Sequence, residues 1–433
     1  MFEKETEKYY DEHLDEMLSS LSELIAIDSS FRDPDPEHGL PYGEGSAKAL
    51  EWVQRFGDSI GLHTRNIDNY VVAMDWAEEE PVLAVLSHAD VVPANASEWT
   101  TPPFELNVRD GNIFGRGSVD DKGPTIAVMY AVKCLKELGV KLDKSFRLVV
   151  GGGEEIGCND IEYYQTKESF PDMVITPDGS FPVLSCEKGM VHLTFSAPFE
   201  DGKVTGIKAG TAINAIPDRC TVTCGDIEEK FTGKAAHGSR PENGENAITK
   251  FLSAYEGDNA LLSGLKKLFP HGEFDGTSCG MGFEDSITGR MSCALTLLNT
   301  ENGRLCGGID IRFPIDRTSA EIAGILLDKL GELGFTQDDL DVMEPHHVPE
   351  DSLLVQTLLN VYERVSGRKG ECIAEGGITY VHNTPGGVAF GAEYPWEENN
   401  MHGADEHIPL STFRDNFLMY AQAIMELCGA EAQ

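Results

Sequence analysis

Histidine and carboxylate side chains stand where several predicted strands end. The apolar run PVLAVLS is followed by His88, RLVVGGG by Glu154 and Glu155, and DMVITP by Asp178. Ligands of open α/β sheets bind outside the carboxyl ends of the strands, so these side chains are expected at one edge of a sheet. Imidazole nitrogens and carboxylate oxygens together suit zinc or manganese. The pattern therefore predicts a divalent-metal site at that edge.

Two polar loops add candidates to this site. Asp120 and Asp121 precede a predicted helix in GRGSVDDKG, and His402 lies in NNMHGADEH. Asp90 follows His88 by two residues, where its carboxylate could hold the imidazole tautomer. Taken singly such residues are ordinary, because an Asp pair before a helix is commonly an N-cap and a lone histidine is commonly structural. Their convergence on one predicted edge favours the metal site.

The glycine-rich stretch before the two glutamates does not match a phosphate-binding loop. GGGEEIG lacks the G-x-G-x-x-G spacing, and no G-K-[ST] follows it. We likewise read the G-x-S-x-G turn of serine hydrolases as absent, because GRGSVDD places its serine differently. We expect the small glycines to leave room for metals and substrate beside Glu154 and Glu155.

The segments that carry these residues alternate between helix and strand. Helical spacing at Met17–Ile27 and Gly45–Leu62 is followed by near-continuous apolar strand runs and a helix that Gly139 closes. This alternation is typical of an α/β domain with a mostly parallel, buried sheet flanked by helices.

A second pattern interrupts the first. From residue 187 the chain reads as antiparallel hairpins mixed with helices, as in RMSCALTLLNTENGRLCGGIDIRFP. After MEPHHVPEDS, a predicted helix at Leu353–Val365 and the short strand GGVAFG restore the first pattern. We therefore expect an α/β domain made of residues 1–186 and 347–433, with an α+β domain of residues 187–346 inserted between them.

Composition and charge exclude several classes of partner. The 34 basic residues against 73 acidic ones give a net charge of −39, which argues against nucleic acid or an anionic membrane. No apolar run approaches the roughly 20 residues of a membrane helix, and the acidic N-terminus is unlike a signal peptide. We expect a cytoplasmic protein, and its ten cysteines, none in a C-x-x-C pair, are expected to be reduced.

Several motifs together resemble one known family. LSHADVVP, GNIFGRGSVDDKGP, GGGEEIGCND, PDGSFP and MHGADE occur in this order along nearly the whole chain. They resemble the co-catalytic di-zinc superfamily of aminoacylases, carboxypeptidase G and carnosinase, and most of all its PepV-type bacterial dipeptidases. The resemblance implies a zinc-peptidase-like catalytic domain, with the inserted domain acting as a lid.

The resemblance also implies a set of metal ligands. By position, His88 and Asp178 correspond to ligands of one ion, and Glu155 and His402 to ligands of the other. Asp120 corresponds to the carboxylate that bridges both ions. Two zinc ions are expected, for which manganese or cobalt could substitute.

Catalytic roles follow from the same correspondence. Glu154 corresponds to the general acid/base that takes a proton from a water bridging the two metals and passes it to the leaving amine. Asp90 corresponds to the residue that orients His88. The family resemblance further implies a cis peptide bond between Asp120 and Asp121.

The inserted segment carries the residues expected to contact substrate. Asn214 in GTAINAIPDRC corresponds to a substrate-contacting lid residue, and His237 in GKAAHGSRPENGENA to a histidine that polarises the scissile carbonyl. Arg312 in GGIDIRFP corresponds to the arginine that binds the substrate carboxylate. Without the resemblance, His237 would read as a loop histidine and Arg312 as an ordinary salt-bridge partner. The loop EGGITYVHNTPGGVAFG resembles one that binds the substrate backbone, although His382, Asn383 and Pro385 depart from the family pattern.

The expected function is hydrolysis of a small peptide substrate. We predict a metallopeptidase that cleaves unblocked dipeptides, among which Xaa-His or β-Ala-His types are candidates. The alternative within the superfamily is an N-acyl-amino-acid deacylase, and the alternative outside it is a metal-binding scaffold without catalysis. The length of the insert suits the doubled lid of monomeric members, so a monomer is expected.

Overall fold

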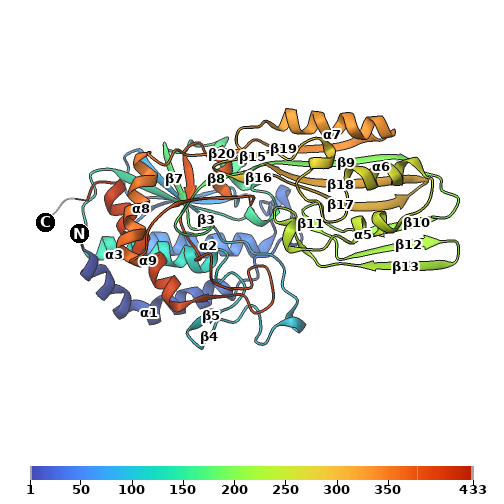
Figure 1. Ribbon diagram of the computed structural model, residues 1–433. Helices are drawn as coiled ribbons and strands as arrows, with labels where there is room; N and C mark the ends of the chain where they lie inside the picture. The colour runs from blue at the N-terminus through green and yellow to red at the C-terminus, as the bar shows by residue number, and fades with distance from the viewer. Residues whose placement is uncertain (1, 378, 431–433) are drawn as a thin grey trace. The chain divides into compact units, whose positions relative to one another are not determined.

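The chain folds into two compact units. The computed structural model describes residues 2–377 and 379–430, which leaves Ile378 of the predicted substrate-backbone loop outside the described residues. The first unit consists of Met1–Ser185, Val348–Ile373 and Ile378–Gln433, and the second consists of Cys186–His347 and Ala374–Gly377 (Figure 1).

Most strands of a nine-stranded sheet form the centre of the first unit, whereas its edge strand β20 belongs to the second unit. Its order is β1-β2-β6-β3-β7-β22-β8-β20, with β21 also pairing with β8. The middle strands β6, β3, β7 and β22 are parallel, whereas β1 and β2 on one side and β8 and β20 on the other pair antiparallel. The strand bounds are His63–Ile67 (β1), Val71–Asp75 (β2), Pro81–His88 (β3), Ser145–Gly151 (β6), Met173–Thr176 (β7), Val183–Glu187 (β8), His346–His347 (β20), Cys372–Glu375 (β21) and Gly387–Ala389 (β22).

Both faces of this sheet are covered, which explains the near-continuous apolar runs. Alternate residues point to opposite faces of a strand, so Leu83 and Val85 of β3 join one apolar cluster, whereas Ala84 and Leu86 join another. The first cluster includes residues of α1, α2, α3, α8 and α9, and the second includes residues of α4 (Figure 1). These helices are Glu3–Ile25 (α1), Glu44–Ser59 (α2), Lys122–Glu137 (α3), Asn159–Gln165 (α4), Leu353–Ser366 (α8) and Leu410–Leu427 (α9). The predicted α/β fold with a sheet flanked by helices is thereby confirmed.

A small three-stranded sheet joins two loops of the first unit. Its order is β23-β5-β4, with bounds His407–Pro409, Asn112–Phe114 and Asn107–Arg109. His407 pairs with Phe114 across β23 and β5. The loop after β5 and the loop before β23 are therefore held next to each other.

The second unit contains an antiparallel sheet of seven strands with the order β13-β12-β10-β17-β18-β9-β19 (Figure 1). Helices α5 (Ala247–Ala254), α6 (Ala260–Leu268) and α7 (Ser319–Leu333) contribute to the apolar cluster on this sheet. The strands are Gly189–Pro198 (β9), Gly206–Ala209 (β10), Arg219–Cys224 (β12), Ile227–Thr232 (β13), Ser292–Glu301 (β17), Arg304–Phe313 (β18) and Thr336–Met343 (β19). The two-stranded antiparallel sheet of β11 (Ala215–Ile216) and β14 (Ala236–His237) is separate from this sheet. Among the described residues, no helix has both the length and the apolar character needed to cross a membrane.

Candidate metal centre

Parallel strands bring three of the candidate segments to one edge of the first unit's sheet. His88 is the last residue of β3 and lies opposite Gly151, the last residue of β6. Glu154 and Glu155 follow β6 in a 3-10 turn, and Asp178 follows β7, which also pairs with β3. The three strands point in the same direction, so the segments after them meet at one edge.

The other two candidates reach the same place from loops. Asp120 precedes α3, and His402 lies in the loop before β23. His402 Nε2 lies 2.8 Å from Asp120 Oδ2, although 282 positions separate the two residues in the chain. The Asp120–Asp121 peptide is cis, as the family resemblance implied.

These side chains form two groups that share one carboxylate. His88, Asp120 and Asp178 make up the first group, and Asp120, Glu155 and His402 make up the second. Asp120 Oδ1 lies 2.9 Å from His88 Nε2, whereas Asp120 Oδ2 faces His402. Asp178 Oδ2 is 3.8 Å from His88 Nε2, and Glu155 Oε2 is 3.3 Å from His402 Nε2. Within each group the candidate ligand atoms lie within 4.8 Å of one another.

The chemistry of the two groups fits divalent metal ions. Each group combines one imidazole nitrogen with carboxylate oxygens, a donor set that suits zinc or manganese. Glu155 Oε1 is buried and has no hydrogen-bond partner among the described residues, although buried carboxylate oxygens are normally paired. A cation bound by the second group would satisfy this oxygen.

The pKa values of the ligand side chains other than Asp120 are shifted upward. Burial alone would raise the pKa of Asp120 as well, but hydrogen bonds from His402 and His88 hold it well below its ordinary value. Burial, together with the neighbouring carboxylate of Asp120, raises the pKa of Glu155 and raises that of Asp178 well above its ordinary value. Hydrogen bonds to Asp120 and Glu155 raise the pKa of His402 to about 11. Burial alone would lower the pKa of His88, but hydrogen bonds to Asp120 and Asp90 raise it well above its ordinary value. A bound cation would compensate this concentration of acidic groups and would displace protons from them.

Asp90 contacts both His88 and the turn that carries the glutamates. Its Oδ1 lies 3.3 Å from His88 Nδ1. The same carboxylate accepts hydrogen bonds from the backbone N–H groups of Glu154, at 3.2 Å, and Glu155, at 3.1 Å. The second contact was not predicted from the sequence, since the pattern pointed only to the imidazole.

Glu154 belongs to neither ligand group, but the charges of those groups affect its pKa. Burial, with the nearby carboxylate of Asp178, raises the pKa of Glu154 well above its ordinary value. The thiol of Cys158 lies 3.7 Å from Glu154 Oε1. A carboxyl group whose pKa is raised in this way is a stronger proton acceptor than an ordinary carboxylate, which suits it to proton transfer.

The expectation that the glycines of GGGEEIG leave open space was wrong. A Cβ atom on Gly151 would stand 2.1 Å from the Tyr380 hydroxyl, and one on Gly153 would stand 2.5 Å from the ring of Tyr42. A Cβ atom on Gly152 would meet the Ser46 hydroxyl at 2.4 Å. These positions require glycine because protein side chains pack directly against the backbone, and not because a ligand occupies the space.

The predicted substrate-contacting residues all lie in the second unit, where short contacts connect them. His237 pairs with Ala215, next to Asn214, and the Asn214 carbonyl accepts a hydrogen bond from Gly238 N–H at 2.7 Å. Ser292 pairs with Arg312 across β17 and β18, and its hydroxyl donates to the Gly238 carbonyl at 3.4 Å. Asn214, His237 and Arg312 thus belong to one neighbourhood of this unit.

Arg312 has a partner that sequence reasoning did not identify. Its side chain is only 4% exposed, and its Nε donates to Asp310 Oδ1 at 2.8 Å. Its Nη1 donates to the Gly376 carbonyl at 3.0 Å. Asp310 stands two residues away in GGIDIRFP, and this i, i+2 spacing on a strand was the available signal.

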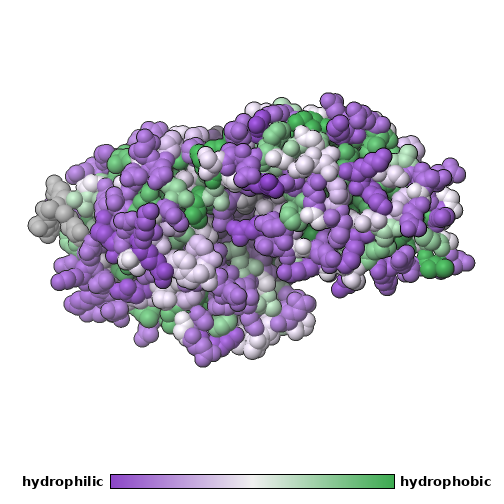
Figure 2. Space-filling model, in the orientation of Figure 1, coloured by the Kyte–Doolittle hydropathy of each residue, from purple (hydrophilic) through white to green (hydrophobic). Residues whose placement is uncertain are grey.

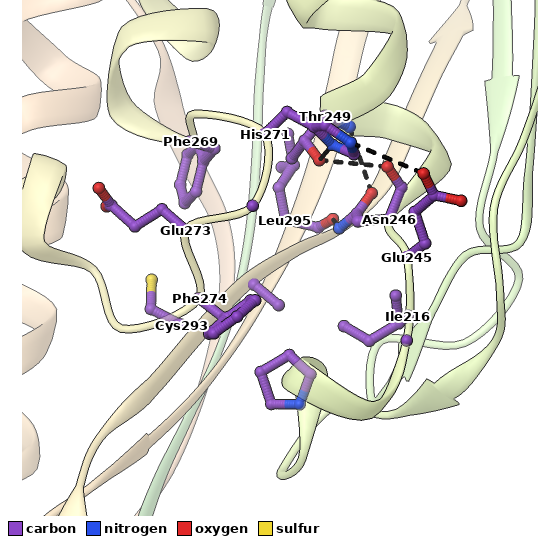
Figure 3. Close-up of a pocket in the computed structure, with 14 residues that line it drawn as sticks. Ile216, Glu245, Asn246, Thr249, Phe269, His271, Glu273, Phe274, Cys293 and Leu295 are labelled. Atoms are coloured by element: carbon purple, nitrogen blue, oxygen red, sulfur yellow. Dashed lines mark hydrogen bonds and ion pairs between the residues drawn. The ribbon is translucent and has the colours of Figure 1, made fainter.

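One serine motif and one cavity do not coincide with the candidate residues. The reading that G-x-S-x-G spacing is absent was wrong, because GTSCG at residues 276–280 has it. This segment forms a 3-10 turn after α6, however, and Ser278 donates to Glu273. A cavity of about 110 Å³ in the second unit is lined by Thr249, His271 and Phe269 among others (Figure 3). A hydrogen bond of 3.0 Å joins Thr249 Oγ1 and His271 Nδ1 there. None of the predicted site residues lines this cavity.

Comparison with known proteins gives a family match and close relatives. Residues 84–426 match Peptidase family M20/M25/M40. The chain is 33% identical to the Beta-Ala-Xaa dipeptidase of Lactobacillus delbrueckii subsp. lactis, across 96% of this chain and 97% of the relative.

Solved structures share the fold. Human carnosine dipeptidase 1 is similar with a TM-score of 0.63 and 15% identity, over 99% of both chains. The dipeptidase Dug1p of Saccharomyces cerevisiae is similar with a TM-score of 0.66 and 14% identity, again over 99% of both chains. At these identities the similarity concerns the fold.

Proposed function

Because the chain belongs to Peptidase family M20/M25/M40, we propose that it is a metal-dependent dipeptidase that hydrolyses unblocked dipeptides. The single observation that carries this proposal is the carboxylate of Asp120, whose two oxygens face two separate histidine-containing groups. The similarity to a Beta-Ala-Xaa dipeptidase along nearly the whole chain supports β-alanyl dipeptides as the first substrates to test.

The family implies the use of divalent metal, and we propose two zinc ions, for which manganese or cobalt could substitute. His88, Asp120 and Asp178 would hold one ion, and Asp120, Glu155 and His402 the other. When bound, the ions would polarise water and the scissile carbonyl. Asp120 contributes to both positions because each of its oxygens faces a different group.

Glu154 is proposed as the general acid/base. Its raised pKa supports this role, because a carboxyl group that binds a proton more tightly than usual is a better base for the proton of the attacking water and can return that proton to the leaving group. Glu154 would take a proton from the attacking water and deliver it to the nitrogen of the leaving amine. Asp90 would keep this turn in place through the backbone N–H groups of Glu154 and Glu155, and would hold His88 as well.

The second unit is proposed to supply the substrate contacts. His237 would stabilise the developing oxyanion, and Asn214 would contact the substrate backbone. Arg312 would bind the C-terminal carboxylate of the substrate. This contact favours substrates whose second residue carries that carboxylate, which are dipeptides. We further propose that the protein is a monomer, which is consistent with the long insert. We also propose that it is cytoplasmic.

A dipeptide panel before and after chelation tests this function. The panel includes β-Ala-His, α-linked dipeptides, tripeptides and N-acetyl amino acids, with zinc or manganese added back after chelation. We expect cleavage of dipeptides that chelation abolishes and added metal restores. Cleavage that survives exhaustive chelation would contradict the metal mechanism, and cleavage of N-acetyl amino acids alone would indicate a deacylase.

Two histidines of one segment provide a matched pair of variants. His402→Gln should remove activity because it removes a ligand. His407→Gln should keep activity, because His407 stacks on Phe114 at 4.7 Å and its Nδ1 faces a backbone carbonyl. Equal losses in the two variants would argue against the assignment of His402.

A further inference from the structure

A buried ion pair joins the two loops that carry Asp120 and His402. Arg116 is 2% exposed and Glu406 is fully buried, and Arg116 Nη1 donates to Glu406 Oε2. The two residues are 290 positions apart in the chain. Neither belongs to the two ligand groups, and neither was singled out from the sequence, although Glu406 follows His402 within MHGADE.

Glu406 fixes the backbone that leads into Asp120. Its Oε1 accepts hydrogen bonds from the N–H groups of Gly117 at 3.0 Å, Val119 at 3.1 Å and Asp120 at 3.4 Å. A carboxylate that accepts several backbone N–H groups makes charge-assisted bonds, which are stronger than bonds between neutral groups. One side chain therefore determines the conformation of the turn that presents the shared carboxylate.

Arg116 fixes the backbone of the other ligand. Its Nη2 donates to the carbonyl of His402 and to that of Gly403, both at 3.2 Å. His402 has a φ of +61°, a left-handed conformation that residues other than glycine adopt uncommonly and at a cost. The guanidinium bonds provide a specific compensation for this conformation.

We propose that Arg116 and Glu406 are positioning residues that set the distance between Asp120 and His402, and hence the affinity of the second group for its ion. This inference rests on the proposed function, because it assumes that the second group binds metal. The pairing of β5 with β23 already brings the two loops together, but a backbone ladder does not orient the side chains beyond it. A buried ion pair contributes little net stability compared with apolar residues, so its value here lies in geometry.

Metal titration of three variants tests the proposal. Arg116→Met removes every donor but keeps an unbranched side chain of similar length. Arg116→Lys keeps the charge but replaces the planar fork of donors with a single ammonium nitrogen. Arg147→Met is the matched control, because Arg147 is also buried and pairs with Asp75 and the Tyr164 hydroxyl in the same unit. Zinc affinity and stoichiometry are measured on the metal-free proteins by competition with a chromophoric chelator, alongside circular dichroism and melting temperature.

The expected result is a loss confined to one ion. Wild type and Arg147→Met should bind two zinc ions, whereas Arg116→Met should bind one with unchanged affinity and the second about 10- to 100-fold more weakly. The affinity of Arg116→Lys for the second zinc ion should lie between those of wild type and Arg116→Met. His402→Gln should lose the same ion that Arg116→Met binds more weakly. If Arg116→Met does not fold, Glu406→Gln, which keeps the shape of the side chain, takes its place.

The outcomes separate this proposal from the proposed function. Wild type that binds no zinc would overturn the proposed function itself. Two zinc ions bound by Arg116→Met with wild-type affinities would overturn the positioning role alone. The role would also be overturned if Arg147→Met lost zinc affinity as much as Arg116→Met, since the effect would then reflect general destabilisation.

Discussion

At the scale of single residues, the neighbours Glu154 and Glu155 have different surroundings. Glu155 Oε2 lies 3.3 Å from His402, within a ligand group. Glu154 lies outside both groups, and its pKa is raised by burial and by Asp178. Asp90 accepts hydrogen bonds from the backbone N–H groups of both residues, so one carboxylate holds the turn that carries both glutamates.

The same conservative change at these two positions should have different effects. We expect Glu154→Gln to keep its bound metal but to lose turnover by about 10²- to 10⁴-fold, because proton transfer is removed. Glu155→Gln should lose one metal ion, because a charged ligand is removed. Metal analysis after dialysis and kcat for a dipeptide measure the two effects, and equal metal loss in both variants would contradict the roles.

Protons and metal should compete for the ligand groups. The pKa values of His88, His402, Glu155 and Asp178 are raised without metal, so these groups keep their protons up to a higher pH than they would in water. A cation must displace those protons, so binding should release them and the apparent affinity should rise with pH. Titration calorimetry in buffers of different ionisation enthalpy measures this release. Binding that takes up protons, or that is independent of pH, would contradict the ligand set.

At the scale of elements, the end of β6 is restricted by what packs against it. Asp160 accepts hydrogen bonds from Gly153 N–H at 2.9 Å and from the Tyr380 hydroxyl at 2.5 Å. A Cβ atom on Gly151 would stand 2.2 Å from Asp160 Oδ2 and 2.1 Å from the Tyr380 hydroxyl. The start of α4 and the segment of Tyr380 thus set the path of the chain into the two glutamates.

Gly151→Ala should therefore destabilise the first unit by about 1–3 kcal/mol, because the added methyl group overpacks the contact with Asp160 and Tyr380. Gly324→Ala is the control, since Gly324 lies in α7 and a Cβ atom there meets nothing within 4 Å. The control should be neutral or stabilising by about 0.5–1 kcal/mol. Urea unfolding measures both changes, and a Gly151→Ala protein as stable as wild type would refute the packing argument.

At the scale of the whole molecule, acidic residues dominate the surface chemistry. The net charge is −39, and the face shown in Figure 2 is mostly hydrophilic, with small, separate hydrophobic patches. Such a charge attracts cations and disfavours polyanionic partners. The specific binding of metal nevertheless depends on the two ligand groups, whose members span the first unit from His88 to His402.

Metal removal should destabilise the first unit as a whole. A cation that binds only the folded arrangement stabilises it, by about 2.7 kcal/mol when free metal is 100 times Kd. Chelation should therefore lower the melting temperature, and added zinc should restore it. The chelator-dependent loss should be smaller in His402→Gln, and a melting temperature of wild type that chelation leaves unchanged would contradict the metal centre.

The sequence by itself determined the kinds of element and the kinds of ligand. Apolar runs such as that of β3 ending at His88 mark buried strands, because residues covered on both faces must be apolar throughout. The types and order of the motif residues were enough to predict the α/β fold and the family, since histidine and carboxylate side chains carry metal chemistry wherever they meet.

Only the tertiary structure decided which atoms meet. The approach of Asp120 to His402, the link between Arg116 and Glu406, and the packing of Tyr380 against Gly151 all join segments that are far apart in the chain. The pairing of Arg312 with Asp310 is local, yet it too depends on the side-chain orientations within the second unit. Periodicity reports which face of an element is buried, but contacts between distant segments depend on how the elements pack, and the fine geometry of the site follows from that packing.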